Sequence, residues 1–150
     1  MKLSAHDFAD QMNEVMPVIL KRFVRMQAEE LNKGQITPPQ ILILEFLNRK
    51  GPSKMTDIAR FMGTSTAAST GIVDRLVKSG YVIRSFDEKD RRIVKIKIVA
   101  KGLDLAKKIS FNRRNMLINI FGRISEQDRF DYLRILKKIR DNLIKEGDQG

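Results

Sequence analysis

The sequence predicts a mainly α-helical fold that carries one small β-hairpin. Three observations support this class. Apolar residues recur at helical spacing over most of the 150 residues. Alternation of apolar and charged residues is confined to residues 93–99, as expected of a strand with one buried face. Serine, threonine, proline and glycine residues stand where the helical segments should begin and end, so the order of elements is four helices, a hairpin and two long helices.

The first two helices are bounded by recognisable capping sequences. A capping box, Ser4-Ala-His-Asp7, precedes the first helix, which should end near Gly34. Pro17 should bend this helix or mark the start of a second segment. Its helical repeat comprises Phe8, Met12, Val15, Met16, Ile19, Leu20 and Phe23. Thr37 should cap the second helix, which has prolines in its first turn and ends at Gly51. Its buried stripe is expected to be Ile41, Leu44 and Leu47.

Two short helices follow, joined by a turn that contains glycine. Ser53 should cap the third helix, which buries Ile58, Ala59 and Met62 and stops at Gly63. Ser65 opens the fourth helix after a tight turn, and Gly80 ends it. The inward positions of the fourth helix are expected to be Ser69, Ile72, Val73, Leu76 and Val77. This arrangement is typical of a helix-turn-helix.

The hairpin comes directly after the fourth helix. Residues 81–86 and 93–99 should form its strands and residues 87–90 its turn. Alternation places Val94, Ile96 and Ile98 on the core face and Lys95 and Lys97 on the other. Extended backwards, the same alternation places Arg91 outward and Arg92 inward. A charged hairpin beside a helix-turn-helix predicts a winged helix-turn-helix.

Two long helices close the chain, over residues 101–121 and from Ser125 to about residue 146. A capping box, Ser125-Glu-Gln-Asp128, opens the last one. Its buried positions are expected to be Leu133, Leu136, Ile139 and Leu143. The first helix and these two carry more apolar surface than one chain of this size needs to cover, including Phe8, Phe23, Phe111, Phe121 and Phe130. The surplus predicts a dimer interface.

Composition restricts the classes of partner and chemistry. The net charge is +11, and residues 51–101 alone carry 11 basic and 5 acidic side chains, so a polyanionic partner is expected. Nucleic acid, an anionic membrane and an acidic protein all satisfy charge alone. There is no cysteine and one histidine, His6, so thiol chemistry is excluded and no histidine cluster for a metal exists. Without a long apolar run or a signal pattern, a cytoplasmic protein that does not enter membranes is expected.

The candidate binding residues lie on the fourth helix and on the hairpin. Small side chains at the start of the helix would let it approach base edges in a groove. Gly71 costs about 1 kcal/mol relative to alanine in a helix interior, which close approach to DNA or tight packing would explain equally. Arg75 should hold a phosphate or an acidic neighbour, with neither favoured. The helix candidates are Ser65, Thr66, Ala67, Ser69, Thr70, Gly71 and Arg75.

In the hairpin, Lys89 and Arg91 lie at or beside the tip, where an arginine could enter a minor groove. The alternative is that a charged tip serves only solubility. Asp90 and Arg92 are expected to form an internal ion pair that shapes the loop. Further phosphate contacts are expected from Lys54, Arg60, Lys95 and Lys97, each of which could instead be an ordinary solvated charge.

Over nearly the whole chain, the order of elements and three stretches of sequence resemble the MarR family of transcriptional regulators. The stretches are Ile36-Thr-Pro-Pro-Gln40 with Leu44 and Leu47; Thr70-Gly-Ile-Val-Asp-Arg-Leu76 with Gly80-Tyr-Val82; and Asp87-Glu-Lys-Asp-Arg-Arg92 with Val94 and Gly102. The resemblance implies a single domain over residues 1–150, with a winged helix at 35–101 and dimerisation helices at 1–34 and 102–146. It also implies a homodimer on a palindromic operator and a small effector, often an anionic aromatic. The absence of cysteine excludes the branch of the family that senses thiol oxidation.

The resulting hypothesis is a homodimeric, ligand-responsive regulator of transcription, most often a repressor, that binds double-stranded DNA without a cofactor or metal. An enzyme is the weaker hypothesis, because no phosphate-binding loop, metal-ligand cluster or nucleophile–base–acid set is present. The other alternative is a winged helix that binds RNA or assembles with proteins. Sequence-specific RNA binding generally needs exposed aromatic residues, and only Tyr81 and Phe86 lie near the candidate surface.

Overall fold

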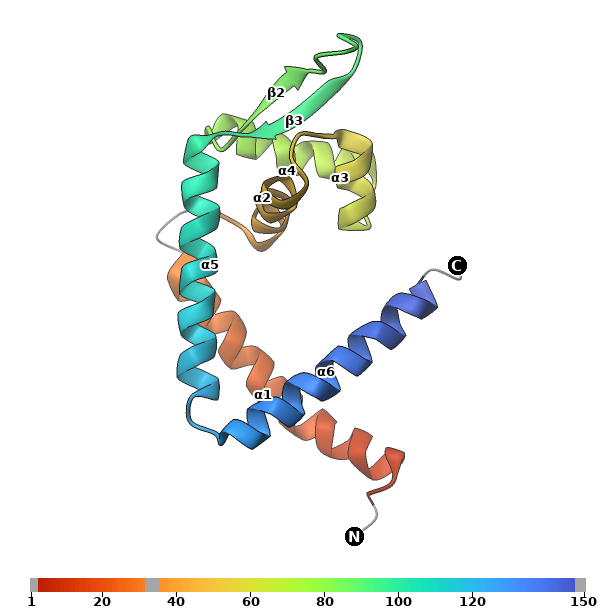
Figure 1. Cartoon of the computed structure of the whole chain (residues 1–150), viewed down its shortest axis with the longest axis vertical. Coiled ribbons are helices and arrows are strands. Elements are labelled where there is room, and N and C mark those ends of the chain that lie inside the picture. Colours follow the sequence, from red (N-terminus) through yellow and green to blue (C-terminus); the bar gives the residue numbers. More distant parts are fainter. Residues whose placement is uncertain (1–2, 32–35, 148–150) are drawn as a thin grey trace. The chain divides into compact units, whose positions relative to one another are not determined.

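The computed structural model describes residues 3–31 and 36–147, and the side chains of residues 3–26 and 36–147. Within this part of the chain there are six α-helices and a three-stranded antiparallel sheet (Figure 1). The chain divides into two units, Met1–Asn112 and Arg113–Gly150. The first contains the winged helix-turn-helix that the sequence predicts.

Helix α1 (Ala5–Leu31) is continuous through Pro17. The expectation of a separate second segment is therefore wrong. The predicted capping box forms, because the backbone N–H of Asp7 donates to Ser4 Oγ over 3.1 Å and the Ser4 hydroxyl donates back to the Asp7 carboxylate. The predicted end near Gly34 lies outside the described residues. No described side chain of α1 is buried in the single chain, so its apolar stripe is left exposed or half-exposed.

Helix α2 (Pro38–Lys50) is the central helix of the first unit. The backbone N–H of Thr37 donates to Gln40 Oε1 over 2.8 Å, which fastens its first turn. The predicted stripe is buried, but so are Gln40, Ile43 and Phe46. The burial is wider than one stripe because α2 contacts α3, α4 and β3. Gly51, with a φ of 80°, ends the helix as expected.

Ser53 does not cap the third helix. Strand β1 (Ser53–Lys54) pairs with β3, and α3 (Met55–Met62) begins only after Lys54. The Ser53 hydroxyl donates to the Gly51 carbonyl over 2.9 Å, so it closes the turn before the strand. Gly63 ends α3 in the left-handed region, with a φ of 64°, as the sequence predicts.

Helix α4 (Thr66–Lys78) begins at the predicted cap, where Ser65 Oγ accepts the N–H of Ala68 over 3.1 Å. Its inward face buries Ser69, Val73 and Leu76 against α2 and α3. Ile72 and Val77 are half-buried against the same core. The helix-turn-helix is thus held by one apolar cluster.

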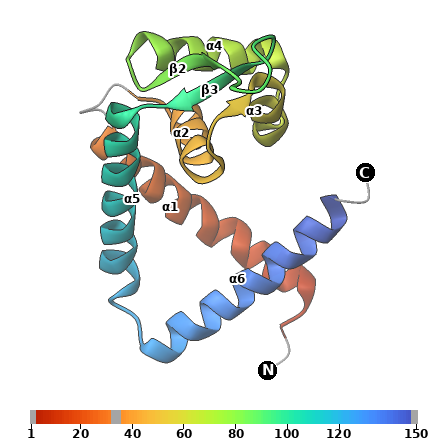
Figure 2. The ribbon, with the colours of Figure 1, turned by 45° about the horizontal axis from the view of Figure 1, so that its top comes forward.

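Strands β2 (Val82–Phe86) and β3 (Val94–Ile98) form the hairpin, and the order in the sheet is β1-β3-β2. Val82 and Ile96 anchor it in the core. In both views the hairpin lies beside α4 (Figures 1 and 2), and β2 contacts that helix. The predicted boundaries are one residue too long at the outer ends, because the ladder ends where Val82 faces Ile98.

The first turn of α5 (Ala100–Phe121) packs tightly on the base of the hairpin. A Cβ added at Gly102 would lie 2.2 Å from the carbonyl oxygen of Tyr81, so only glycine fits there. Lys101 Nζ donates to the Ser79 carbonyl over 2.8 Å and lies 4.8 Å from the centre of the Tyr81 ring. These contacts join α5 to the end of α4.

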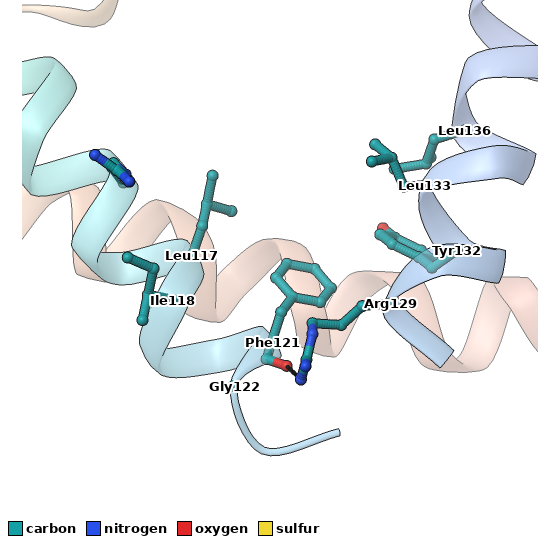
Figure 3. A pocket seen from close by; sticks show the side chains of 9 residues that line it. Leu117, Ile118, Phe121, Gly122, Arg129, Tyr132, Leu133 and Leu136 are labelled. Carbon is teal, nitrogen blue, oxygen red and sulfur yellow. Dashed lines mark hydrogen bonds between the residues drawn. The ribbon is translucent and has the colours of Figure 1, made fainter. Parts of the chain in front are cut away.

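The second unit contains the end of α5, from Arg113 onward, and the whole of α6 (Glu126–Gly147). Ser125 caps α6 as predicted, accepting the N–H of Asp128 over 3.1 Å. Phe121 and Tyr132 stack with ring centres 5.3 Å apart, and Arg129 donates to the Phe121 carbonyl over 3.2 Å. An apolar groove of about 640 Å³ lies between the two helices, with Leu117, Leu133 and Leu136 directed into it (Figure 3).

The expected burial of α6 does not occur within the single chain. No described residue of α6 is buried, and its apolar stripe is open to solvent. The exposed members include the four predicted core positions Leu133, Leu136, Ile139 and Leu143. Apart from its contacts with the end of α5, the apolar face of α6 is exposed within the described residues.

Candidate nucleic-acid interface

The exposed face of α4 begins with small side chains. Ser65, Thr66 and Ala67 are all exposed, and their short side chains leave the first turn of the helix accessible. The Ser65 hydroxyl oxygen also caps the helix. Thr70 is half-buried, and its hydroxyl donates to the Thr66 carbonyl over 2.7 Å. A helix with this kind of start can approach the edges of bases closely.

Ser69 does not belong to this surface. Its exposed fraction is 0%, and its hydroxyl is hydrogen-bonded to Thr64 Oγ1 over 2.8 Å. The sequence placed Ser69 both among the inward positions and among the binding residues. The structure supports the first placement and excludes a direct contact between its side chain and DNA.

Gly71 lies on the exposed face, and its surroundings decide between the two explanations for a glycine in a helix. A Cβ added there would meet no atom of the described chain within 4 Å. Tight packing inside the chain therefore does not require glycine. Close approach of DNA to this face of α4 stays a prediction.

The next turn of α4 carries one paired and one unpaired charge. Asp74 forms an ion pair with Arg84 on β2, which ties the helix to the hairpin. Among the described residues, none forms an ion pair with Arg75, so the acidic neighbour allowed by the sequence is absent from that part of the chain. Arg75 is exposed and can bind a phosphate.

At the hairpin tip, Asp87 organises the loop. One of its carboxylate oxygens accepts the backbone N–H groups of Lys89 and Asp90 over 2.8 and 3.1 Å, and the other lies 2.7 Å from Lys95 Nζ. The hydrogen bond from Lys95 lowers the pKa of Asp87 to about 2, with further contributions from the two backbone N–H groups. Asp87 therefore stays charged throughout the physiological range.

The predicted Asp90–Arg92 pair is present. Arg92 Nε and Nη2 donate to the two carboxylate oxygens of Asp90 over 3.1 and 3.2 Å, and the pair keeps the pKa of Asp90 below its ordinary value. However, the inward placement of Arg92 is wrong, since its side chain is 91% exposed. Regular alternation begins only at Val94, where β3 starts, and Arg91 and Arg92 lie in the turn before it.

The ion pairs within the winged helix show which charged side chains have a partner in the protein and which could bind phosphate. Lys95 forms an ion pair with Asp87, and Arg60 lies 3.4 Å from Asp57, so both of these expected phosphate ligands have an acidic partner within the chain. Exposed cations of α4 and the hairpin that have no ion pair among the described residues are Arg75, Lys78, Lys89, Arg91 and Lys97. Because most acids of this segment are held in pairs, the available charge is mainly positive.

Sequence reasoning missed the Asp74–Arg84 and Asp87–Lys95 pairs. The first joins a helix to a strand ten residues further along, and no local pattern indicates such a contact. The second had a partial signal, because aspartate at the start of a turn commonly accepts backbone N–H groups. The described side chains, those of residues 3–26 and 36–147, include no cluster that could ligate a metal, and no helix in the described part of the chain is long and apolar enough to cross a membrane.

The fold and the exposed basic surface of α4 and the hairpin define a winged helix-turn-helix protein of the class that binds DNA. The sequence pattern of the MarR family matches residues 36–94. YfiV of Bacillus subtilis (strain 168), an uncharacterized HTH-type transcriptional regulator, is 32% identical over 120 residues, which are 78% of this chain and 75% of YfiV. The chain therefore belongs to the MarR family of DNA-binding transcriptional regulators.

Two further relatives support this assignment. The HTH-type transcriptional repressor MdtR of the same organism is 25% identical over 135 residues, which are 87% of each chain. The solved structure of a MarR family protein from Bacillus stearothermophilus shares the fold, with a TM-score of 0.83 and 23% identity, and the match covers 94% of this chain and 99% of that one. The sequence relatives therefore show the family, and the solved structure shows the same fold.

Proposed function

We propose that this chain is a ligand-responsive repressor that binds a palindromic operator as a homodimer. In each copy, α4 enters the major groove and the hairpin tip reaches the adjacent minor groove. Exposed cations on both elements that form no ion pair with a described residue support this assignment, because a backbone phosphate would neutralise them. The repressor role is supported by the likeness to MdtR, which is a transcriptional repressor.

The DNA-contacting residues of the proposal are the accessible ones. On α4 they are Ser65, Thr66, Ala67, Thr70, Gly71 and Arg75, and on the hairpin they are Lys89 and Arg91. Asp90, Arg92 and Lys95 act indirectly, by holding the shape of the tip. Salt dependence would distinguish the contacting cations Arg75, Lys89 and Arg91 from Arg92 and Lys95, because only cations that bind phosphate release counterions.

The dimer in this proposal is built from α1, α5 and α6. The exposed apolar faces of α1 and α6 support it, because such surfaces are rarely left open to water. Two winged helices held about 34–36 Å apart, one turn of DNA, would read a palindrome. A small effector would act by favouring a dimer geometry with a different spacing, which shifts the population away from the form that binds the operator.

Selection of bound sequences from random duplex DNA tests the proposal directly. The purified protein is expected to enrich a palindrome with half-sites about 10 base pairs apart, centre to centre. An enriched sequence without dyad symmetry would contradict the dimeric arrangement. Failure to enrich any duplex would remove the operator function, and binding to RNA or to another protein would then be the alternative to test.

A further inference from the structure

The outer end of the hairpin carries an apolar pair that the protein leaves open. Phe86 is 67% exposed and Val94 is 44% exposed. They face each other directly across the two strands, at the last rung of the ladder before the tip. In the described chain, neither belongs to the buried core or to the residues packed against it. The pair is therefore a small exposed apolar surface next to the charged tip.

The pair faces the side of the hairpin that meets α4. Side chains alternate along a strand, so Val82, Arg84 and Phe86 lie on one face of β2. Val82 is fully buried in the core with Val73 of α4, and Arg84 forms an ion pair with Asp74 of α4. Phe86 is the next residue on this face, further toward the tip. It therefore lies beyond the ion pair, between the exposed face of α4 and the tip.

This position matters if α4 and the tip enter neighbouring grooves, because one DNA strand must then pass between them. The backbone of that strand presents charged phosphates and the apolar C–H faces of its deoxyribose rings. The charges around the pair suit such a strand, since Asp87 and Asp90 are held in ion pairs, while Lys89 and Arg91 form none with any described residue. Glu88 is the remaining acid of the tip and is exposed.

We propose that Phe86 and Val94 pack against deoxyribose rings of the DNA backbone, between the groove read by α4 and the groove entered by the tip. The inference rests on the proposed operator function and deepens it. Phosphate contacts on either side orient the strand, and the apolar pair fixes its distance from the hairpin. The pair contributes to affinity without reading sequence, since deoxyribose is the same at every position.

The test compares Phe86→Ala with Ile83→Ala. Ile83 is a matched control because it lies in the same strand, is 45% exposed, and points to the opposite face. On a duplex selected by the wild-type protein, Phe86→Ala should weaken binding about tenfold, as expected for loss of a partly buried aromatic contact. The slope of affinity against salt should not change, because no charge is removed. Ile83→Ala should bind as the wild type does.

Two further measurements distinguish a lost DNA contact from a loss of stability. Phe86→Ala should retain the thermal midpoint of the wild type, since the side chain is mostly exposed, and Val94→Thr should weaken binding severalfold by placing a hydroxyl against the sugar. Unchanged affinity of Phe86→Ala, with Arg91→Ala impaired, would overturn this inference and leave the operator function standing. A weaker dimer with unchanged affinity per dimer would assign the pair to an interface between copies instead.

Discussion

A single carboxylate, that of Asp87, holds the hairpin tip in shape. It accepts two backbone N–H groups and the ammonium of Lys95, which together lower its pKa from 3.8 to about 2. A group whose pKa is lower in the folded protein stabilises the fold at pH values above its unfolded pKa. The contribution of Asp87 is therefore complete above about pH 3.8 and is lost as the pH falls toward 2. The tip should remain ordered in mildly acidic solution.

Lys95→Gln should raise the pKa of Asp87 toward 3.8, because it removes the largest cause of the shift. The two backbone N–H groups remain, so the pKa should not return fully. An NMR titration of the Asp87 carboxyl carbon measures this change. Lys97→Gln is the matched control, since Lys97 lies in the same strand and makes no ion pair within the described residues. A shift of equal size in both variants would contradict the assigned contact.

Arg91→Ala should weaken operator binding strongly and reduce the slope of log affinity against log salt by about 1. Arg91 is exposed at the tip and pairs with no acid in the described chain, so its charge is available to DNA. Titration of operator DNA at two salt concentrations measures both effects. Arg140→Ala removes a charge from α6, where Arg140 pairs with Asp141, and should leave the slope unchanged. Unaltered affinity of Arg91→Ala would restrict the tip to a role in solubility.

At the scale of elements, two glycines in helices serve opposite purposes. Gly71 has open space around it, so Gly71→Ala should stabilise the free protein by about 0.5–1 kcal/mol through helix propensity. The same methyl group should weaken DNA binding, because it projects from the face of α4 that we propose approaches the bases. Urea unfolding and operator titration of the variant measure these two effects. A higher free energy of unfolding with unchanged operator affinity would show that DNA does not approach α4 at this position.

Gly102→Ala should have the reverse effect on stability. Its Cβ would meet the Tyr81 carbonyl at 2.2 Å, which forces the backbone apart where α5 joins the hairpin. Overpacking of this kind typically costs about 1–3 kcal/mol. Urea unfolding should therefore give changes of opposite sign for Gly71→Ala and Gly102→Ala. A neutral Gly102→Ala variant would mean that α5 is less tightly joined to the hairpin than the structure indicates.

Most element boundaries followed from local signals, and the exceptions have a physical reason. The caps at Ser4, Thr37, Ser65 and Ser125 act within one helical turn, so the sequence is sufficient to identify them. Strand β1 has two residues and no pattern of its own. It exists because β3 offers an edge for Ser53 and Lys54 to pair with. Such a strand can be identified only when its partner is in place.

At the scale of the whole molecule, the exposed apolar face of α6 predicts association. The purified protein should sediment as a dimer at micromolar concentration. Leu136→Asp should weaken the dimer at least about 100-fold, because it places a charge in the proposed interface. Operator affinity should fall with it, since a palindrome requires two copies. Sedimentation at several concentrations measures the association.

Lys138→Gln is the control for this prediction. It lowers the charge of α6 by the same one unit at an exposed position on the opposite face of the helix from Leu136, and it should remain dimeric. A wild-type protein that sediments as a monomer would remove the argument for two winged helices at a fixed spacing. A dimeric Leu136→Asp variant would instead place the interface on other surfaces.

The sequence by itself determined the class of fold, the helix-turn-helix and the basic hairpin. These depend on periodicity, caps and turns, which act over a few residues. Only the tertiary structure decided which charged and small residues are available. Ser69 is buried, Lys95 is paired with Asp87, and Gly71 is open, although all three lie in the same stretch of sequence. The reason is that burial and ion pairing depend on contacts between separate elements, which no local pattern records.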